Sequence, residues 1–553
     1  TQALKVLSSS GAITLKDLSP TGLTGTYSGL YLRPGASADL YLGSDGSTVL
    51  SGSSTASSSG INIQSDKVSF VANTYKTTAN TSGALVVESV GSIFTSALDT
   101  TAFGISGSPS SVRLGKTSNT ANVTLANAIT AAGPITVYGG DITLKTNLTS
   151  TLAGAAIKLL ATGTITSNTA SNTLTTNGGA VLLASDTEGD GFGSIYVSSS
   201  GLTIDTRTGL AGSKSTTGIG GGAITLAGGD QAGTGYASGV SSTAAGGINS
   251  DGYLGLLSGG GDITMRGRSW AGAVSSGYQA WGIAHWGSAG FVADSGVGKI
   301  YLEGISRSSG TSSYKMGIST YYAVDLKSAY AGADAIKLVG SSTTSGAGWN
   351  HGVDLGTGNE GYSSATYQRI VASGVGGGVS IIGTGNEWAV LIRNGTQILA
   401  NGGPINIKAG GLGATATVSN FYFRNGSTQW WGSAAGSAVP TTTSNLLIEF
   451  DSYSGSGYPN IATNGTVTWQ STSNAFGGAI DTSWFAWNTN SQTMTGLTIG
   501  KSTNNQAVGF STTNIAANGP ITAYGSDINV NMNLTTGGGA AGDVLLKAKG
   551  YVS

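Results

Sequence analysis

The feature that most constrains the fold is an internal repeat with a period of 35 to 39 residues. A glycine-rich turn followed by an apolar–polar–apolar segment recurs, as in GGAITL (221–226) and GKIYL (298–302). The first apolar positions of four such segments are Ile224, Ile263, Ile300 and Ile336. A second series with the same period lies between them, at Ile283, Ile318, Val353 and Val390. Two interleaved strand series of one period predict stacked coils.

Elementary strand physics selects the architecture. A short parallel strand satisfies its backbone hydrogen bonds when it stacks on an equivalent strand about 4.8 Å away. Apolar residues then point inward, Thr, Ser and Asn point outward, and glycine fits the corners. We therefore predict an all-β protein, specifically a β-solenoid of the right-handed parallel β-helix type with loop insertions. One period is either one large coil or two small ones, and an array of β-sandwiches is the main structural rival.

A second repeat acts over a much longer distance. The segment GPITVYGGDITLKTNLTS (133–150) returns as GPITAYGSDINVNMNLTT (519–536), 386 residues later. The similarity extends upstream to Leu114 and Ile499. The sequence ends inside the second copy, so we expect it to be part of a longer protein.

Composition excludes several classes of protein. Of 553 residues, 92 are Gly and only 9% are charged, so a mostly helical fold is excluded. Hydrophobic residues make up 39% of the chain and alternate with polar ones, which argues against disorder. The net charge is −1 and no basic stripe exists, which argues against nucleic acid as a partner. We also expect no transmembrane segment, because no apolar run has spanning length.

The repeats divide the sequence into five regions. Residues 1–112 form a Ser/Thr-rich β-repeat region, and 113–220 hold the first long-repeat copy with further coils. Regular coils fill 221–410. An aromatic-rich insertion or β-module occupies 411–498, and the truncated second copy fills 499–553.

Several of these segments resemble a known family. The run VANTYKTTANTSGALVVESVGSIFTSAL (71–98), GPITVYGGDITL and the GGAITL-type units are similar to the giant, repetitive, secreted β-strand-repeat proteins of Gram-negative bacteria, the filamentous-haemagglutinin-like adhesins. The resemblance implies export, a β-helical shaft, and an extracellular or cell-surface role in adhesion or fibre formation. It implies no catalytic residues.

One acidic turn is a candidate calcium site. DTEGDG (186–191) places Asp186, Glu188 and Asp190 at alternate positions, which allows carboxylates to converge on one hard cation. An EF-hand is excluded, because Val197 stands where a bidentate glutamate is needed and flanking helices are lacking. A solvated acidic turn is the alternative interpretation.

The aromatic residues allow two interpretations. Exposed Tyr and Trp bind the flat faces of sugars or another protein, whereas buried ones only pack. The candidate contact surface consists of Tyr422, Trp430, Trp431, Trp484 and Trp487. For Trp281, Trp286 and Trp349 we expect stacking in the core or at its ends.

Other chemistry finds little support. The only histidines, His285 and His351, lie in matching strand series and are expected to pack or to lie on the surface. GTGNEG (356–361) matches a dinucleotide-binding pattern, but no helix follows it, which predicts a β-turn. Asp354 paired with Glu360 or Glu387 is the available acid pair for a groove.

These observations favour a structural protein. The leading hypothesis is a non-enzymatic segment of a β-helical surface fibre that associates end to end or laterally and contacts cell-surface glycans or proteins. The alternatives are a β-helical polysaccharide-degrading enzyme or phage tailspike, which needs clustered acids, and an ice-binding solenoid, which needs Thr-x-Thr in register on successive coils. No cofactor is expected apart from the calcium candidate.

Overall fold

The computed structural model describes two units of the chain. Unit 1 comprises Thr1–Val240 and Asn249–Thr264, and unit 2 comprises Ser241–Ile248 and Met265–Ser553. The described residues are 4–7, 11–17, 30–32, 40–43, 58–71, 76–168, 171–210, 212–275, 278–310, 314–342, 349–356, 368–393, 396–410, 420–424, 430–432, 443–456, 460–484, 486–487, 494–511, 514–537 and 542–553. Two strands, β25 (Ile248–Ser250) and β27 (Ile263–Arg268), each contain a unit boundary.

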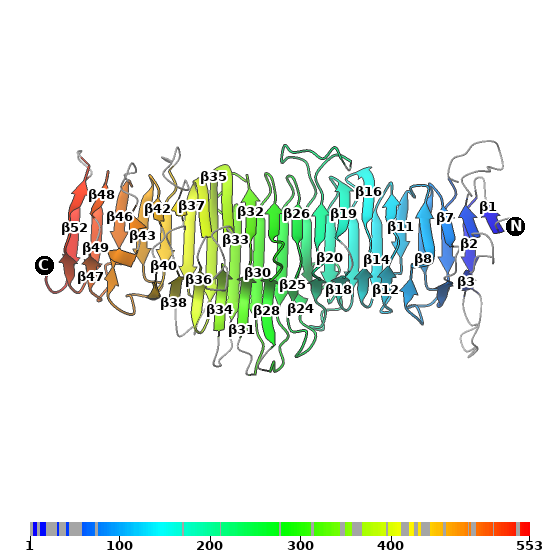
Figure 1. Ribbon diagram of the computed structural model, residues 1–553, viewed down its shortest axis with the longest axis horizontal. Coiled ribbons are helices and arrows are strands. Elements are labelled where there is room, and N and C mark those ends of the chain that lie inside the picture. Colours follow the sequence, from blue (N-terminus) through cyan, green and yellow to red (C-terminus); the bar gives the residue numbers. More distant parts are fainter. Residues whose placement is uncertain are drawn as a thin grey trace. The chain divides into compact units, whose positions relative to one another are not determined.

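Unit 1 is a stack of three-stranded coils whose strands pair in parallel with those of the next coil (Figure 1). Its ladder A consists of β2 (Ile13–Lys16), β5 (Ile61–Gln64), β8 (Ala84–Glu88), β11 (Ser111–Leu114), β14 (Ile135–Gly139), β17 (Ile157–Ala161), β20 (Val181–Ser185) and β23 (Ile224–Gly228). Ladder B contains β9 (Leu98–Asp99), β12 (Val123–Leu125), β15 (Ile142–Leu144), β18 (Ile165–Ser167) and β21 (Ile195–Val197).

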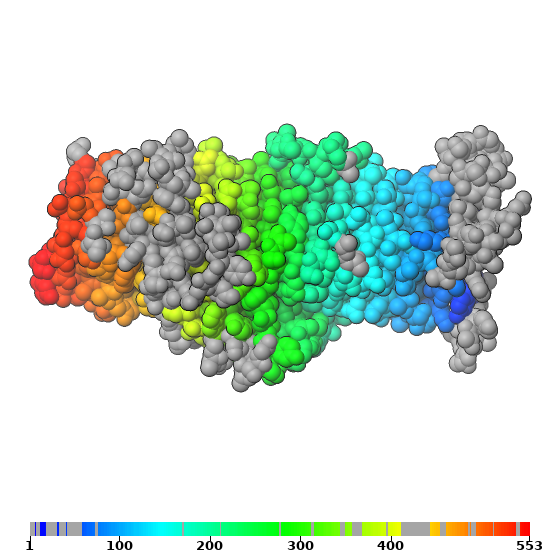
Figure 2. Space-filling view, viewed as in Figure 1, coloured from blue at the N-terminus to red at the C-terminus, as the bar shows by residue number. Residues whose placement is uncertain are grey.

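The third side of unit 1 is built in the same way. Ladder C contains β13 (Ile129–Ala131), β16 (Leu148–Ala153), β19 (Asn172–Asn177), β22 (Leu202–Asp205) and β26 (Leu254–Leu257). The earlier strands are β1 (Leu4–Leu7), β3 (Leu30–Leu32), β4 (Leu40–Gly43), β6 (Val68–Phe70), β7 (Thr77–Asn80) and β10 (Phe103–Ser106), and β24 (Ala237–Ser238) follows β23. In Figure 2 the colours of unit 1 change in bands, because each coil contacts mainly its neighbours in sequence.

Unit 2 repeats the arrangement, with longer strands in its first coils. Its ladder A consists of β30 (Ile300–Ser306), β33 (Ile336–Ser342), the second halves of β35 (Gln368–Thr384) and β37 (Thr396–Ala409), β40 (Leu446–Glu449), β43 (Thr466–Gln470), β46 (Gly496–Ile499), β49 (Ile521–Gly525) and β52 (Val544–Ala548). Ladder B contains β28 (Gln279–His285), β31 (Tyr314–Thr320), β34 (Trp349–Leu355), β36 (Trp388–Ile392), β38 (Asn420–Arg424) and β41 (Ser452–Ser456).

The remaining elements of unit 2 complete its coils. Ladder C contains β29 (Phe291–Asp294), β32 (Val324–Ser328), the first halves of β35 and β37, β39 (Trp430–Gly432), β42 (Asn460–Ala462) and β45 (Ala486–Trp487). The others are β44 (Ile480–Asp481), β47 (Val508–Phe510), β48 (Ile515–Ala517), β50 (Ile528–Val530), β51 (Leu534–Thr536) and the 3₁₀ helix η1 (Thr482–Trp484).

The strand registers confirm the predicted all-β solenoid, a parallel β-helix. Ile300 pairs directly with Ile336 in ladder A, and Ile283 pairs with Ile318 in ladder B. The two sequence series are therefore two sides of the same coils, and one period of 35 to 39 residues is one large coil. The strands of 411–498 that the structure describes continue these ladders, so this stretch is built of coils as well.

The coils differ in size. Ile135 and Ile157 pair directly although only 22 residues separate them, whereas 36 residues separate Ile300 from Ile336. We call the coils of residues 112–167 narrow coils and those of residues 279–393 wide coils. In both, apolar residues alternate with polar ones, as in the strand ITVYG of β14, where every second residue is buried. Burying one such apolar side chain contributes about 1.5–3 kcal/mol.

Glycines allow two sides of each wide coil to approach closely. A Cβ atom on Gly304 of β30 would lie 2.0 Å from the carbonyl oxygen of Gly317 in β31. Gly340 and Gly352 have the same relationship in the next coil, again at 2.0 Å. The glycine within WGIA, MGIS and HGVDL is therefore a packing requirement, because a larger residue would collide with backbone.

The long sequence repeat folds twice into the same structure. Asn119 and Asn504 are both buried, and each donates through Nδ2 to two backbone carbonyls, those of Ala121 and Tyr138 in the first copy. Phe94 N–H donates to Oδ1 of Asn119, as Phe476 N–H donates to Oδ1 of Asn504. The two copies therefore share internal hydrogen bonds as well as amino-acid sequence.

The shared structure begins further upstream than the sequence match. Gln64 Nε2 donates to Glu88 Oε1 at 2.8 Å in one copy, and Gln470 Nε2 donates to Glu449 Oε1 at 2.8 Å in the other. The amide and the acid have exchanged places, which hides the equivalence in the sequence. Within the described residues, no helix is long and apolar enough to cross a membrane.

Candidate functional site

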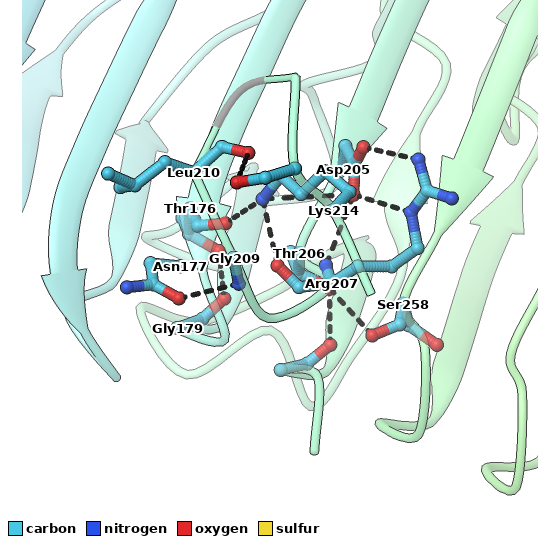
Figure 3. Close-up of polar contacts among 12 residues, drawn as sticks. Thr176, Asn177, Gly179, Asp205, Thr206, Arg207, Gly209, Leu210, Lys214 and Ser258 are labelled. Carbon is cyan, nitrogen blue, oxygen red and sulfur yellow. Dashed lines mark hydrogen bonds and ion pairs between the residues drawn. The ribbon is translucent and has the colours of Figure 1, made fainter. Parts of the chain in front are cut away.

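A lysine with a largely buried side chain anchors one loop of unit 1. The loop leaves the coil after β22 and returns at β23, and Lys214 points back from it into the coil (Figure 3). Its Nζ donates to the carbonyls of Thr176 and Arg207, and only 9% of its side chain is exposed. Burial lowers the pKa of Lys214, opposed by the nearby Asp205 carboxylate.

The neighbours of Lys214 are also held by internal contacts. Arg207 forms a two-point ion pair with Asp205, with Nε to Oδ1 at 3.0 Å and Nη2 to Oδ2 at 2.8 Å. Gly209 N–H donates to Asn177 Oδ1 at 2.8 Å (Figure 3). These contacts fix the loop on the coil, and we assign this cluster a structural role.

The predicted calcium site does not form a metal-binding group. Asp186 is fully buried, and its two carboxylate oxygens accept from Gly191 N–H at 3.0 Å and Ser238 Oγ at 2.9 Å. Glu188 and Asp190 are exposed. Among the described residues, no three His, Asp or Glu side chains lie close enough to hold a metal ion. Asp186 points inward because its left-handed backbone, with φ of 53°, closes the turn.

The carboxylates of this turn still affect one another. Partial burial raises the pKa of Glu188, although a backbone hydrogen bond lowers it, and the charges of Asp190 and Asp186 raise it further. The alternating acids therefore form an acidic turn that is locked to the coil through Asp186.

The predicted aromatic contact surface divides into three parts. The side chains of Tyr422, Trp430 and Trp431 lie outside the described residues, although their backbones belong to β38 and β39. Trp487 is buried and its indole N–H donates to Thr482 O at 3.0 Å, so it packs and offers no contact face. Trp484 is partly buried and stacks on Tyr453 at 4.5 Å between ring centroids.

Both histidines are buried, but their surroundings differ. His285 lies 5.9 Å from the Phe291 ring, and burial lowers its pKa to about 4, opposed only in part by an interaction with the Gly287 backbone. His351 instead lies among charged groups. The sequence predicted packing or surface placement for both, which describes His285 alone.

His351 belongs to a buried ionic cluster in unit 2. Its Nδ1 lies 3.0 Å from Asp354 Oδ2, three residues along β34. Arg393, at the end of β36 in the next coil, donates through Nε and Nη2 to both oxygens of Asp354 at 2.9 Å. On the other side, His351 Nε2 lies 3.6 Å from Glu387 Oε2.

The charges in this cluster control one another. Burial opposes ionisation of Asp354, but Arg393 and then His351 hold the pKa of that carboxyl well below its usual value. Burial also lowers the pKa of His351, but hydrogen bonds and charges from Asp354 and Glu387 outweigh burial and raise it. His351 therefore remains cationic at higher pH than a free histidine.

Aromatic rings cover the same end of ladder B. Trp349 is 38% exposed, and the Arg393 guanidinium carbon lies 5.1 Å from its ring centroid. Tyr314 pairs in register with Trp349 and meets its ring edge to face at 5.5 Å. Glu387, with 40% of its side chain exposed, lies beside them in the connection before β36. Trp349 is therefore a surface residue, whereas Trp281 and Trp286 stack on each other at 4.9 Å as predicted.

The sequence indicated only parts of this cluster. Asp354 and Glu387 were predicted to share a groove, and both do contact His351. Asp354 is buried and ion-paired, so it is no accessible acid partner for Glu387. Glu360 lies outside the described residues, as does GTGNEG after Gly356. Arg393 was missed, because it is 39 residues from Asp354 and meets it only through coil stacking.

Comparisons of this chain with protein-family models, with curated proteins and with solved structures gave no match.

Proposed function

We propose that the chain is a non-enzymatic segment of a long extracellular fibre or filament at a bacterial cell surface, which attaches cells or assembles a matrix. The observation that carries this proposal is the duplicated module. Gly133 and Gly519 occupy equivalent corners, where an added Cβ would lie 1.9 Å from a carbonyl of the preceding coil in both copies. A chain that rebuilds the same coils with the same contacts adds length without a new fold.

The outer faces of the narrow coils suit lateral association. Thr124, Thr143 and Thr166 are in register on successive coils of ladder B. Such rows offer neutral hydroxyl groups for hydrogen bonds with a second shaft. Charged side chains frequently pair between coils, as Arg113 does with Glu88 at 2.8 Å, which limits repulsion between subunits.

The alternatives receive less support from the described residues. A polysaccharide-cleaving enzyme of the usual kind needs two accessible carboxyl groups across one bond, and Asp354 is committed to Arg393. An ice-binding face needs Thr-x-Thr motifs in register on successive coils. In the motif of β19, Thr175 pairs with Thr149 on the preceding coil but with Asp205 on the following one, whereas Thr173 pairs with Thr203. The motifs are therefore staggered from coil to coil.

Electron microscopy of the purified chain at low resolution tests the proposal. We expect filaments that lengthen as protein concentration rises and that carry a regular axial repeat. Discrete short rods at every concentration, especially threefold ones, contradict the fibre proposal and favour a tailspike-like protein.

A further inference from the structure

We propose that the exposed end of ladder B around Trp349 and Glu387 binds a neutral carbohydrate chain, with the indole ring as the stacking platform and the carboxylate as acceptor for sugar hydroxyl groups. This inference deepens the proposed attachment function and rests on it, because it names the class of target.

One glutamine and two aromatic residues form a row across three successive coils. Gln279, Tyr314 and Trp349 are in register at the starts of β28, β31 and β34. Tyr278, directly before this row, is 45% exposed. Neighbouring coils of a parallel sheet lie about 4.8 Å apart. An extended oligosaccharide laid along this row therefore meets aromatic or amide groups on several consecutive coils.

Trp349 is held in place before any ligand arrives. The Arg393 guanidinium lies over its ring at 5.1 Å, and the ring of His351 stacks beside it at 5.8 Å. Arg393 is itself fixed by its two-point contact with Asp354. A large, rigid side chain of this kind contributes contact area with little loss of conformational entropy.

Glu387 supplies the polar part of the site. His351 Nε2 lies 3.6 Å from Glu387 Oε2, on the side of the carboxylate that faces the buried cluster. We assign His351 as a positioning residue, because it orients the carboxylate and is itself only 2% exposed as a side chain. The exposed part of the carboxylate accepts hydrogen bonds from hydroxyl groups, a pattern that ionised acids form strongly.

The balance of charge favours a neutral ligand. Arg393 and protonated His351 carry two positive charges, and Asp354 and Glu387 carry two negative ones. Both cationic groups are buried, so neither is presented to an anionic partner. Sugars that carry carboxylate or sulfate groups would meet Glu387 first and be repelled.

The other aromatic groups of unit 2 are less suited to this role. Trp281 is buried, and Trp286 is sandwiched between it and Tyr321, whose ring centroid lies 4.3 Å away. Trp484 stacks on Tyr453 and is partly buried. Trp484 is therefore a matched control for Trp349, because both are partly exposed tryptophans of the same unit.

A panel of immobilised hexasaccharides tests the proposal with the full chain. The panel contains neutral glucan, galactan and mannan hexamers and one acidic hexamer, a galacturonan. We expect the wild-type chain to bind at least one neutral hexamer and to bind the acidic one at least tenfold more weakly. Titration calorimetry on the tightest neutral hexamer then gives dissociation constants for the variants.

Three substitutions locate the site. Trp349→Ala should weaken binding at least 30-fold and Glu387→Gln about fivefold to tenfold, whereas Trp484→Ala should leave it within twofold. Unchanged far-UV circular dichroism shows that each variant is folded. If His351 positions Glu387, the dissociation constant of the wild-type chain should change between pH 6 and 9 as His351 loses its proton, and Glu387→Gln should remove that change. If His351 is purely structural, Glu387→Gln should leave the pH dependence unchanged.

The outcomes separate this proposal from the fibre proposal. Failure of the wild-type chain to bind any neutral hexamer, or equal binding by Trp349→Ala, overturns the carbohydrate site. Filaments in electron micrographs together with such a failure leave the fibre proposal intact and point to a protein target. Tight binding lost only in Trp484→Ala moves the contact surface to the 411–498 stretch and also overturns the proposal.

Discussion

The narrow coils of residues 112–167 and the wide coils of residues 279–393 use the same ladder construction with different amounts of chain. A narrow coil returns to its ladder after 22 residues, between Ile135 and Ile157, and its strands have three to six residues. A wide coil takes 36 residues between Ile300 and Ile336, and its strands in ladders A and B reach seven.

The additional chain changes what the coil carries. In the narrow coils the buried polar residues are neutral, namely Asn119, Ser150 and Ser167, and the Asn119 amide satisfies backbone groups. In the wide coils the interior holds Asp354, Arg393 and His351, and aromatic rings cover the strand ends. The difference teaches that the ladder sets the fold, whereas the residues beyond it are available for chemistry.

The largest expected effect comes from comparing one arginine substitution in each kind of coil. Arg393→Met leaves Asp354 buried without its main partner, so we expect it to destabilise unit 2 by about 3–5 kcal/mol. Arg113→Met removes a pair whose arginine is 43% exposed, and should cost less than about 1 kcal/mol. Urea unfolding of both variants gives the two values, and equal costs would contradict the distinction.

A pH titration sharpens the comparison, because both histidines belong to wide coils. The pKa of His285 is lowered to about 4, so the unfolded chain binds a proton that the folded chain rejects. Stability from this group is present above pH 6.5 and is lost as pH falls toward 4, by about 3 kcal/mol. Urea unfolding between pH 7 and 4 measures the loss, and His285→Phe should remove it. His351, with a raised pKa, acts in the opposite sense and loses its contribution as pH rises above 6.5.

The glycine contacts of the wide coils predict an effect of similar size. A Cβ on Gly317 would lie 2.2 Å from Ser341 N and 2.6 Å from Gly352 O, so Gly317→Ala should cost about 3 kcal/mol. Gly478→Ala is the control, since its Cβ would meet nothing within 4 Å, and should stay within about 0.5 kcal/mol. Similar midpoints in urea for both variants would show that the close approach is absent.

The buried asparagines Asn119 and Asn504 test the equivalence of the two copies of the long repeat. Asn504→Ala removes the side chain that two carbonyls and two N–H groups contact, and should cost about 2 kcal/mol. Asn119→Ala should cost the same, because its contacts match. Asn505→Ala, at an exposed neighbour, should cost less than about 0.5 kcal/mol. Hydrogen exchange of the local amides reports each loss, and clearly unequal effects at 119 and 504 would contradict the equivalence of the two copies.

Much of the fold was predictable from sequence because strand period and coil period are both written in it. Ile300 with Ile336 and Ile283 with Ile318 pair as the two series predicted. The size of a coil was not decided, since a period of 36 residues fits one large or two small coils equally well. Only the register settles that question.

The candidate site was less predictable because its members come from different coils. Asp354 and Arg393 meet across 39 residues, and loops of unequal length separate their strands. The calcium prediction relied only on the spacing of the acidic residues. The backbone turn at Asp186 directs that carboxylate inward instead. The pairs Gln64–Glu88 and Glu449–Gln470 are structurally equivalent, but the amide and the acid occupy opposite positions. A comparison of identical residues in the sequence therefore does not detect them.

The central claim is that wide coils present the ligand-binding surface, whereas narrow coils extend the shaft. Hydrogen exchange of the full chain, with and without the tightest neutral hexasaccharide, tests it most directly. We expect slower exchange at the starts of β31 and β34 and in the connection before β36, with no change in residues 112–167. Protection confined to the narrow coils, or spread evenly along both kinds of coil, would contradict it.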